Sequence, residues 1–194
     1  MMRKVLKAAL ILTLSVSLFS CKKDKDEKPS YNEENFLDGY LAATRFDESK
    51  TNFINNVEYE FGLEFTPTVK GKITALHVKL PDPNETYRVT IWDKDAKTVL
   101  RTEMFNITTA DKNYRFDISD LELAKDKQYA ITANSNDWYT REIKDRSATT
   151  YPVSVGNITI TNFIYLKGAT QTYPTTSSKV YYAGDLSFSF QQTN

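Results

Sequence analysis

The chain contains few of the residues on which common catalytic and metal sites depend. Its 194 residues include one cysteine, one histidine and six glycines. One histidine without a CxxC pair excludes the common zinc sites, and the sequence has neither a GxGxxG nor a GxxxxGK[ST] loop to bind a phosphate. We therefore expect no metal site and no cofactor.

The single histidine is also poorly placed to act as a general base. His77 lies in the strand pattern KITALHVKL, on the face opposite Leu76 and Val78. Neither a GxSxG elbow nor a reactive cysteine accompanies it, so we interpret it as a residue of the sheet surface. Two of the 25 acidic residues could form a glycosidase pair, but nothing in the sequence pairs any two of them. We expect a protein without catalytic activity.

The hydrophobic run near the start of the chain is too short to cross a membrane. Residues 8–19 (AALILTLSVSLF) form an apolar run of 12 residues, whereas a membrane-spanning helix needs about 20. Twelve is typical of the core of a signal peptide, and Arg3, Lys4 and Lys7 supply the basic segment that precedes such a core. We predict that residues 1–20 are a signal peptide.

The only cysteine follows this run directly. Leu18-Phe19-Ser20-Cys21 resembles the lipobox of bacterial lipoproteins, in which cleavage precedes the cysteine and the thiol carries a diacylglyceryl group. The resemblance implies that Cys21 is lipidated and anchors the chain to a membrane. Because Cys21 has no second cysteine to pair with, it forms no disulfide within the chain. The alternative is an ordinary secretory signal that is cleaved near an incidental cysteine.

Residues 21–35 are predicted to be the lipidated cysteine and a charged, flexible tether. The run KKDKDEKPSYNEEN has too few apolar groups to fold. Lysines and acidic residues just after the cysteine resemble the export signal of Bacteroidetes-type lipoproteins, which implies an outer-membrane lipoprotein of the cell envelope, facing the periplasm or the outside. A merely solvated linker is the alternative.

The charge balance excludes one class of partner. Removal of residues 1–20 takes away three basic and no acidic residues, which leaves 22 basic against 25 acidic residues and a net charge of −3. Nucleic-acid binding proteins have a strongly basic surface. We therefore expect no nucleic-acid partner.

Residues 36–194 are predicted to form a single domain. Residues 36–43 (FLDGYLAA) favour a short helix or an irregular lead-in, with Gly39 as an unfavourable residue for a helix. In VEYEFGLEF the apolar side chains then alternate with Glu58, Glu60 and Glu64, which predicts a half-buried strand. In the next strand the period slips near Ala75, which indicates a β-bulge.

The rest of the chain repeats this pattern of short strands. Strands at a spacing of roughly ten residues, without a convincing helix between them, favour an antiparallel sandwich. No repeat of fixed period is visible, which argues against a solenoid or a propeller. We predict an all-β fold, an antiparallel β-sandwich of the immunoglobulin-like or jelly-roll type with the short lead-in before it.

Residues 60–134 carry a second resemblance. The segments FGLEFTPTVKGKITAL, YRVTIWDKDAKTVLRTEMF and ISDLELAKDKQYAITAN are similar to a bacterial domain family of unknown function, most specifically at Ile91-Trp92-Asp93. The family's turn glycine is absent here and is replaced around Ala96 and Lys97. The resemblance implies a β-sandwich found in exported multidomain proteins, often beside sugar-degrading modules. It transfers no catalytic residue.

One turn has a faint likeness to a calcium loop. Asp93-Lys94-Asp95 begins like an EF-hand, but Lys97 and Met104 stand where oxygen ligands are required. An EF-hand is therefore excluded. A looser calcium site that uses Asp93 and Asp95 with Asp82 or Glu85 stays open, with solvated turn residues as the alternative.

The informative positive signal is a change in composition. The last 48 residues, from Ser147, carry three charges, Lys167, Lys179 and Asp185, among many Thr, Ser, Asn and Tyr residues. Aromatic rings with small hydroxyls and amides suit uncharged polar partners such as glycans. Packing in strands is the alternative role for such tyrosines. The candidate ligand-binding residues are Asn136, Trp138 and Tyr139, expected in a loop, and Tyr151, Tyr173, Tyr181 and Tyr182.

These observations predict a cell-envelope lipoprotein that binds without catalysis. Carbohydrate at the cell surface is the expected ligand, and the membrane is a second partner through the anchor at Cys21. A structural, adhesion or assembly subunit that binds another envelope protein is the alternative function. A small glycoside-active enzyme is the third.

Overall fold

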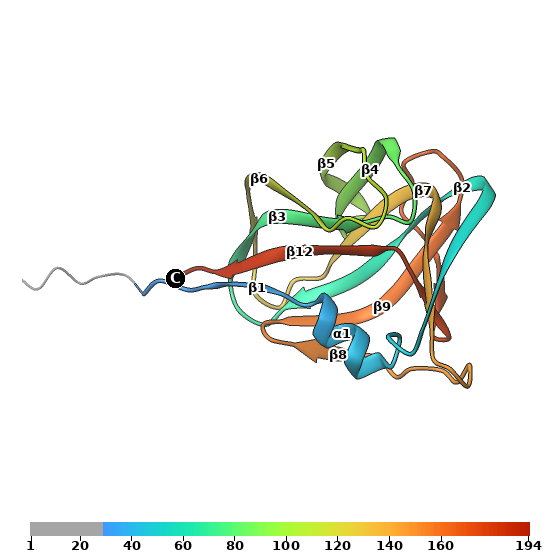
Figure 1. Ribbon diagram of the computed structural model, residues 1–194. Coiled ribbons are helices and arrows are strands. Elements are labelled where there is room, and N and C mark those ends of the chain that lie inside the picture. Colours follow the sequence, from blue (N-terminus) through green and yellow to red (C-terminus); the bar gives the residue numbers. More distant parts are fainter. Residues whose placement is uncertain (1–28) are drawn as a thin grey trace, which may run out of the picture.

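The computed structural model describes residues 29–194, which form two antiparallel β-sheets packed face to face (Figure 1). The smaller sheet has the order β1 (Glu33–Asn35), β12 (Asp185–Gln192), β3 (Gly71–Lys79), β6 (Tyr114–Leu123). The larger has the order β10 (Thr176–Ser178), β9 (Ile158–Lys167), β2 (Ser49–Pro67), β7 (Tyr129–Glu142), β4 (Asn84–Asp93), β5 (Thr98–Ile107), with β8 (Val153–Val155) on β9 and β11 (Tyr181–Ala183) on β7. The predicted all-β sandwich is confirmed. The expected signal peptide and Cys21 lie outside the described residues.

The core lies between the two sheets and follows from the alternation of side chains along the strands. Phe61, Leu63 and Phe65 of β2 are buried on one face, as the period of two predicts. They meet Phe188 and Phe190, which alternate with buried serines along β12. The rings of Phe65 and Phe188 lie 4.7 Å apart. The bulge predicted near Ala75 is present, because the pairing of β3 with β6 shifts between Ile73 and Ala75.

The outer face of β2 differs from the expectation of a half-buried strand. Glu60 and Glu64 are buried, although Glu58 is exposed. Residues 168–178 cross this face and cover it: Arg88 Nη2 donates both to Glu60 Oε2 at 2.8 Å and to the carbonyl of Ala169 at 3.0 Å. Sequence alternation could not show this covering, because the covering segment is more than 100 residues away in the chain.

The long strand β2 is bent where its pairing with β7 is interrupted. Residues 49–54 pair with residues 137–142, and residues 59–65 pair with residues 129–135. Residues 55–58 therefore lie opposite a single residue, Asn136, and this irregular bulge bends the strand. Figure 1 shows β2 turning back at the end of the sandwich farthest from the C-terminus.

A single helix, α1 (Leu37–Thr44), stands at the predicted lead-in. It contacts β8 and β12, and its Tyr40 and Leu41 are buried. Gly39 is explained by this packing, since a Cβ there would lie 2.5 Å from Cγ1 of Val155 in β8. No helix within residues 29–194 is long and apolar enough to cross a membrane.

The predicted tether is too long at its C-terminal end. Glu33–Asn35 form strand β1, which pairs with residues 189–191 of β12. Glu33 also forms an ion pair with Arg115, whose Nη1 lies 2.8 Å from Oε2. The folded part therefore begins before residue 36, because the backbone of this charged segment completes the edge of the smaller sheet.

Candidate functional site

One cavity, with a volume of about 620 Å³, is a groove lined by aromatic side chains. It lies where β2 and β7 extend past the smaller sheet, so the inner face of the larger sheet is left open there. We call it the aromatic groove. Its walls come from β2, β7, β9 and β11 and include Phe53, Tyr59, Trp138, Tyr165 and Tyr181.

One wall of the aromatic groove is built around Trp138. Phe53 stands directly across from Trp138 in the register of β2 and β7, with ring centroids 5.3 Å apart. Tyr59, which follows the bulge, meets the indole edge to face at 5.6 Å. Phe61 supports the indole from the core side at 5.0 Å. Trp138 is thereby held firmly, while Phe53 keeps 43% of its surface exposed at the mouth.

A second part of the lining consists of Tyr165 of β9 and Tyr181 of β11. Their ring centroids lie 5.9 Å apart, and Tyr181 also packs edge to face on Phe163 at 5.5 Å. Burial, with the neighbouring Tyr165 and Tyr59 hydroxyls, raises the pKa of Tyr181. The Tyr181 phenol therefore stays neutral, ready to donate and accept hydrogen bonds.

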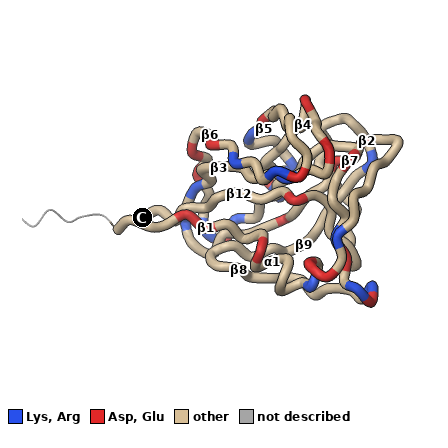
Figure 2. The backbone as a smooth tube through the Cα atoms, in the orientation of Figure 1, with Lys and Arg blue, Asp and Glu red and all other residues tan. Residues whose placement is uncertain are grey.

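The remaining lining includes three small hydroxyl side chains. Ser49, Thr51 and Thr140 alternate with outward-facing residues along β2 and β7, so they share the face of Trp138. Glu142 and Arg146 are the charged residues of the lining, and their closest charged atoms are 3.7 Å apart. The aromatic groove is thus an apolar surface edged with hydroxyls and nearly without unbalanced charge. Elsewhere charged residues of both signs are interspersed along the chain (Figure 2).

The expectation that Asn136, Trp138 and Tyr139 lie in a loop is wrong. All three belong to β7, and Trp138 and Tyr139 are buried. The polar residues around them suggest a loop, but residues 49–54 of β2 provide a pairing partner that continues β7 to Glu142. Trp138 still lines the aromatic groove, with its Nε1 donating to Thr140 Oγ1 at 3.2 Å.

Tyr139 and Asn136 do not join the aromatic groove. Tyr139 points to the opposite face of β7, where its hydroxyl donates to Asp111 and the Nζ of Lys50 lies 3.6 Å from its ring centre. Asn136 is exposed at the bulge, and its Nδ2 donates to the carbonyl of Asn55 at 3.3 Å.

Three of the four candidate tyrosines near the C-terminus are structural. Tyr182 is in the core, 5.4 Å from the ring of Tyr40. Tyr151 is half-buried, and its hydroxyl hydrogen-bonds that of Tyr40 at 2.6 Å. Tyr173 is buried on the outer face of the larger sheet, donating to Glu64 Oε1 at 2.6 Å. Only Tyr181 reaches the aromatic groove, because alternation in β11 turns Tyr182 the other way.

The structure adds Phe53, Tyr59 and Tyr165 to the predicted pair Trp138 and Tyr181. Tyr59 shares the period of the core residues of β2, so its alternation indicates burial rather than a site. Phe53 follows Ser49 and Thr51 at a period of two, a signal that could have marked residues 49–53 as a strand with one aromatic face.

The possible cation site near Asp93 is not supported by the geometry. Asp93 instead binds Lys127, with Oδ2 2.7 Å from Nζ, and caps its turn by accepting from the Ala96 N–H at 3.1 Å. Among residues 29–194, no group of three or more His, Cys, Asp or Glu residues is placed to hold a metal ion. His77 is half-buried in β3 and hydrogen-bonds Ser189 Oγ through Nε2 at 2.9 Å.

Comparison with known proteins agrees with the resemblance seen in residues 60–134 and extends it. No curated protein matches the chain. A family model described as "Domain of unknown function (DUF4082)" matches residues 47–183, a segment that contains the whole lining of the aromatic groove. Because this match covers more than half of the 194 residues, the chain belongs to the family of DUF4082 domains.

Proposed function

We propose that the protein binds carbohydrate in the aromatic groove and that it does so without catalysis. The observation that carries the proposal is the set of aromatic side chains that line one groove: Phe53, Tyr59, Trp138, Tyr165 and Tyr181. Aromatic faces offer large, rigid contact areas to the C–H groups of a sugar ring, and phenol hydroxyls add hydrogen bonds.

The size and charge of the aromatic groove support a neutral polar ligand. Its volume of about 620 Å³ lies within the range of roughly 300 to 1,000 Å³ of small-ligand sites. The charges of Glu142 and Arg146 offset one another, so the groove needs no charged ligand to balance them. Hydroxyls of Ser49, Thr51 and Thr140 stand where a sugar's hydroxyls need partners.

A binding assay on the full-length chain tests this proposal. We expect a glycan array to retain the protein on at least one polysaccharide. Phe53→Ala should weaken that binding about fivefold or more, as expected for losing about 1 kcal/mol of ring contact. Phe53 is half exposed, so its truncation leaves the core intact.

Met104→Ala is the matched control, because Met104 is an exposed apolar residue of β5, remote from the aromatic groove. Its binding should equal that of the unmodified chain. If the array retains the protein on no glycan, the carbohydrate proposal fails. Equal losses in both variants would mean that the ligand binds elsewhere.

We further propose that Cys21 is lipidated and holds the domain at the outer membrane. The support is the LFSC sequence after the apolar run, and the position of the aromatic groove suits it. The groove lies at the end of the sandwich remote from β1, by which the chain enters the fold (Figure 1). An anchored domain would therefore present the groove away from the membrane.

Cys21→Ser tests the anchor. The substitution should abolish labelling by a fatty-acid probe and move the protein from the membrane fraction to the soluble fraction. Lys22→Ser, next to it, should change neither. Labelling that persists in Cys21→Ser would contradict lipidation.

A protein partner is the second candidate function, and the free edge of the larger sheet supports it. Within residues 29–194, β5 pairs only with β4, and it exposes Val99, Leu100 and Met104 to 45, 41 and 57%. Unprotected apolar edges are places where another chain can add a strand. Cross-linking in cells from position 100 should trap one defined envelope protein, and the absence of a discrete product would count against this function.

A further inference from the structure

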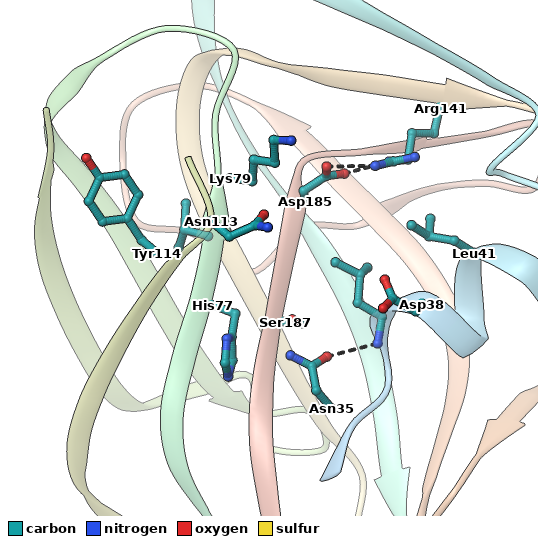
Figure 3. A pocket seen from close by; sticks show the side chains of 12 residues that line it. Asn35, Asp38, Leu41, His77, Lys79, Asn113, Tyr114, Arg141, Asp185 and Ser187 are labelled. Carbon is teal, nitrogen blue, oxygen red and sulfur yellow. Dashed lines mark hydrogen bonds and ion pairs between the residues drawn. The ribbon is translucent and has the colours of Figure 1, made fainter. Parts of the chain in front are cut away.

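A second cavity, unlike the aromatic groove, lies between α1 and the outer face of the smaller sheet. It has a volume of about 360 Å³, and its lining combines polar and charged side chains with the apolar side chains of Leu37, Leu41 and Val78 (Figure 3). Its floor is Ser187 of β12 with His77 of β3. Asn35 and Asp38 stand on one side, and Asn113 stands on another. We call it the polar pocket.

The floor of the polar pocket holds an unsatisfied hydroxyl. Ser187 is fully buried, and its Oγ has no hydrogen-bond partner among the described residues. A buried hydroxyl without a partner is costly, so such groups are normally paired. Ser189, two residues along β12, is paired with His77 and Arg115. The hydroxyl of Ser187 therefore has a hydrogen-bonding capacity that no described residue uses, but it is buried, so a ligand reaches it only when neighbouring side chains move.

The charges around the polar pocket are paired except for one carboxylate. Arg141 binds Asp185 through two hydrogen bonds, and Lys79 Nζ lies 3.1 Å from Asp111 Oδ1. Asp38, in the first turn of α1, has no ion-pair partner within residues 29–194, and Figure 3 shows its carboxylate on the pocket side of the helix. A cationic ligand would complete the charge balance.

The other polar groups of the lining can form hydrogen bonds with hydroxyl groups of a ligand. The Nδ2 of Asn35 and both amide atoms of Asn113 form no hydrogen bond with another described residue, although Asn35 Oδ1 accepts from the Leu37 N–H at 3.0 Å. His77 uses only Nε2, and burial together with Arg115 lowers its pKa, which favours the neutral ring. The pocket thus offers donors and acceptors on several sides and one negative charge.

We propose that the polar pocket binds a small hydroxylated amine, of the class of amino sugars, with its ammonium group at Asp38 and a hydroxyl group at Ser187. The pocket is just over half the volume of the aromatic groove and has no facing aromatic rings, so the two sites select different ligands. This proposal does not depend on carbohydrate binding in the aromatic groove.

Titration of the full-length chain in mild detergent with D-glucosamine and with D-glucose tests the proposal, with binding followed by amide chemical shifts. Glucosamine should shift the amides of residues 35–38 and 187 saturably. Glucose should bind about tenfold more weakly, because it lacks the charge-assisted hydrogen bond. Asp38→Asn should reduce the two affinities to the same value, and Ser187→Ala should weaken both.

Asp117→Asn is the matched control for Asp38→Asn. Asp117 is an exposed carboxylate of β6, in the smaller sheet, and lies outside the pocket. Phe53→Ala controls for the aromatic groove, and neither variant should change glucosamine binding. The proposal is overturned if glucosamine shifts no pocket amide at tens of millimolar, or if Asp38→Asn retains the preference for glucosamine over glucose.

Discussion

Arg141 of β7 and Asp185 of β12 form a two-pronged ion pair that joins the two sheets, with Nε 2.6 Å from Oδ1 and Nη2 2.8 Å from Oδ2. Both side chains are largely removed from water, with 13 and 4% exposure. Removing one partner leaves the other charge buried and unpaired, which costs about 3 to 5 kcal/mol in such pairs.

We therefore expect Asp185→Ala to lower the free energy of unfolding by about 3 to 5 kcal/mol, measured by chemical denaturation. The double variant Arg141→Met with Asp185→Leu should recover most of that loss, because it removes both charges. Half-buried Lys72 and exposed Asp120, whose charged atoms are 2.6 Å apart, provide the comparison. Asp120→Ala should cost less than about 1 kcal/mol. Equal losses of unfolding free energy in Asp120→Ala and Asp185→Ala would show that burial does not determine the contribution of the Arg141–Asp185 pair.

Gly62 permits the close approach of β2 and β7. A Cβ at this position would lie 2.7 Å from the Cα of Thr132 and would collide with the carbonyl oxygen of Ile131, which are backbone atoms of a central strand. Gly62→Ala should destabilise the fold by about 2 to 3 kcal/mol or more, measured as a shift in the denaturation midpoint. Gly168→Ala, which has no atom within 4 Å of its added Cβ but a φ of 143°, should cost less. A larger loss at Gly168 would contradict this explanation.

Asp137 should make stability depend on pH. Burial, together with the nearby Asp82 carboxylate, raises the pKa of Asp137 to about 6 from an ordinary value of 3.8, and its Oδ1 has no hydrogen-bond partner among the described residues. Because the folded-state pKa is the higher one, the stabilising contribution of the protonated form is complete below pH 3.8 and is lost as pH rises through 6.

Asp137→Asn should remove this component and raise stability at pH 7 by about 1 kcal/mol, a figure reduced for the partial exposure of the group. Asp82→Asn should lower the pKa of Asp137, as followed by NMR of its carboxyl carbon. Asp95→Asn, in an exposed turn, serves as the control. An Asp137 that titrates at its ordinary value would refute the prediction.

Tyr114 should ionise at a lower pH than an ordinary tyrosine. Hydrogen bonds from Thr108 and the Thr109 N–H, with the charge of Lys112, lower the pKa of the Tyr114 phenol to about 8. Absorbance at 295 nm should show one tyrosine titrating near pH 8, and Tyr114→Phe should remove that step. Thr108→Val should move the step to higher pH. A titration curve that is the same in Tyr114→Phe and the parent chain would disprove the assignment.

Much of the fold could be predicted from the alternation of side chains along each strand. Phe61, Leu63 and Phe65 were recognisable as one face of a strand, the slip at Ala75 as a bulge, and residues 36–43 as a short helix or an irregular lead-in. Each depends on side chains a few residues apart, whose directions follow from the period of the strand or helix. Composition predicted that Trp138 and Tyr181 bind a ligand, and both line the aromatic groove, although their role in binding stays a prediction.

Contacts between distant segments decided the rest. Residues 49–54 extend β7 and turn Trp138 from an expected loop residue into the wall of a groove, and the chain after residue 168 buries Glu60 and Glu64. The sequence alone therefore determined the sandwich class and which strand faces carry aromatic or polar side chains. The tertiary structure decided which faces are covered, and so where the aromatic groove and the polar pocket lie. The physical reason is that a face is covered by segments more than 80 residues away in the chain.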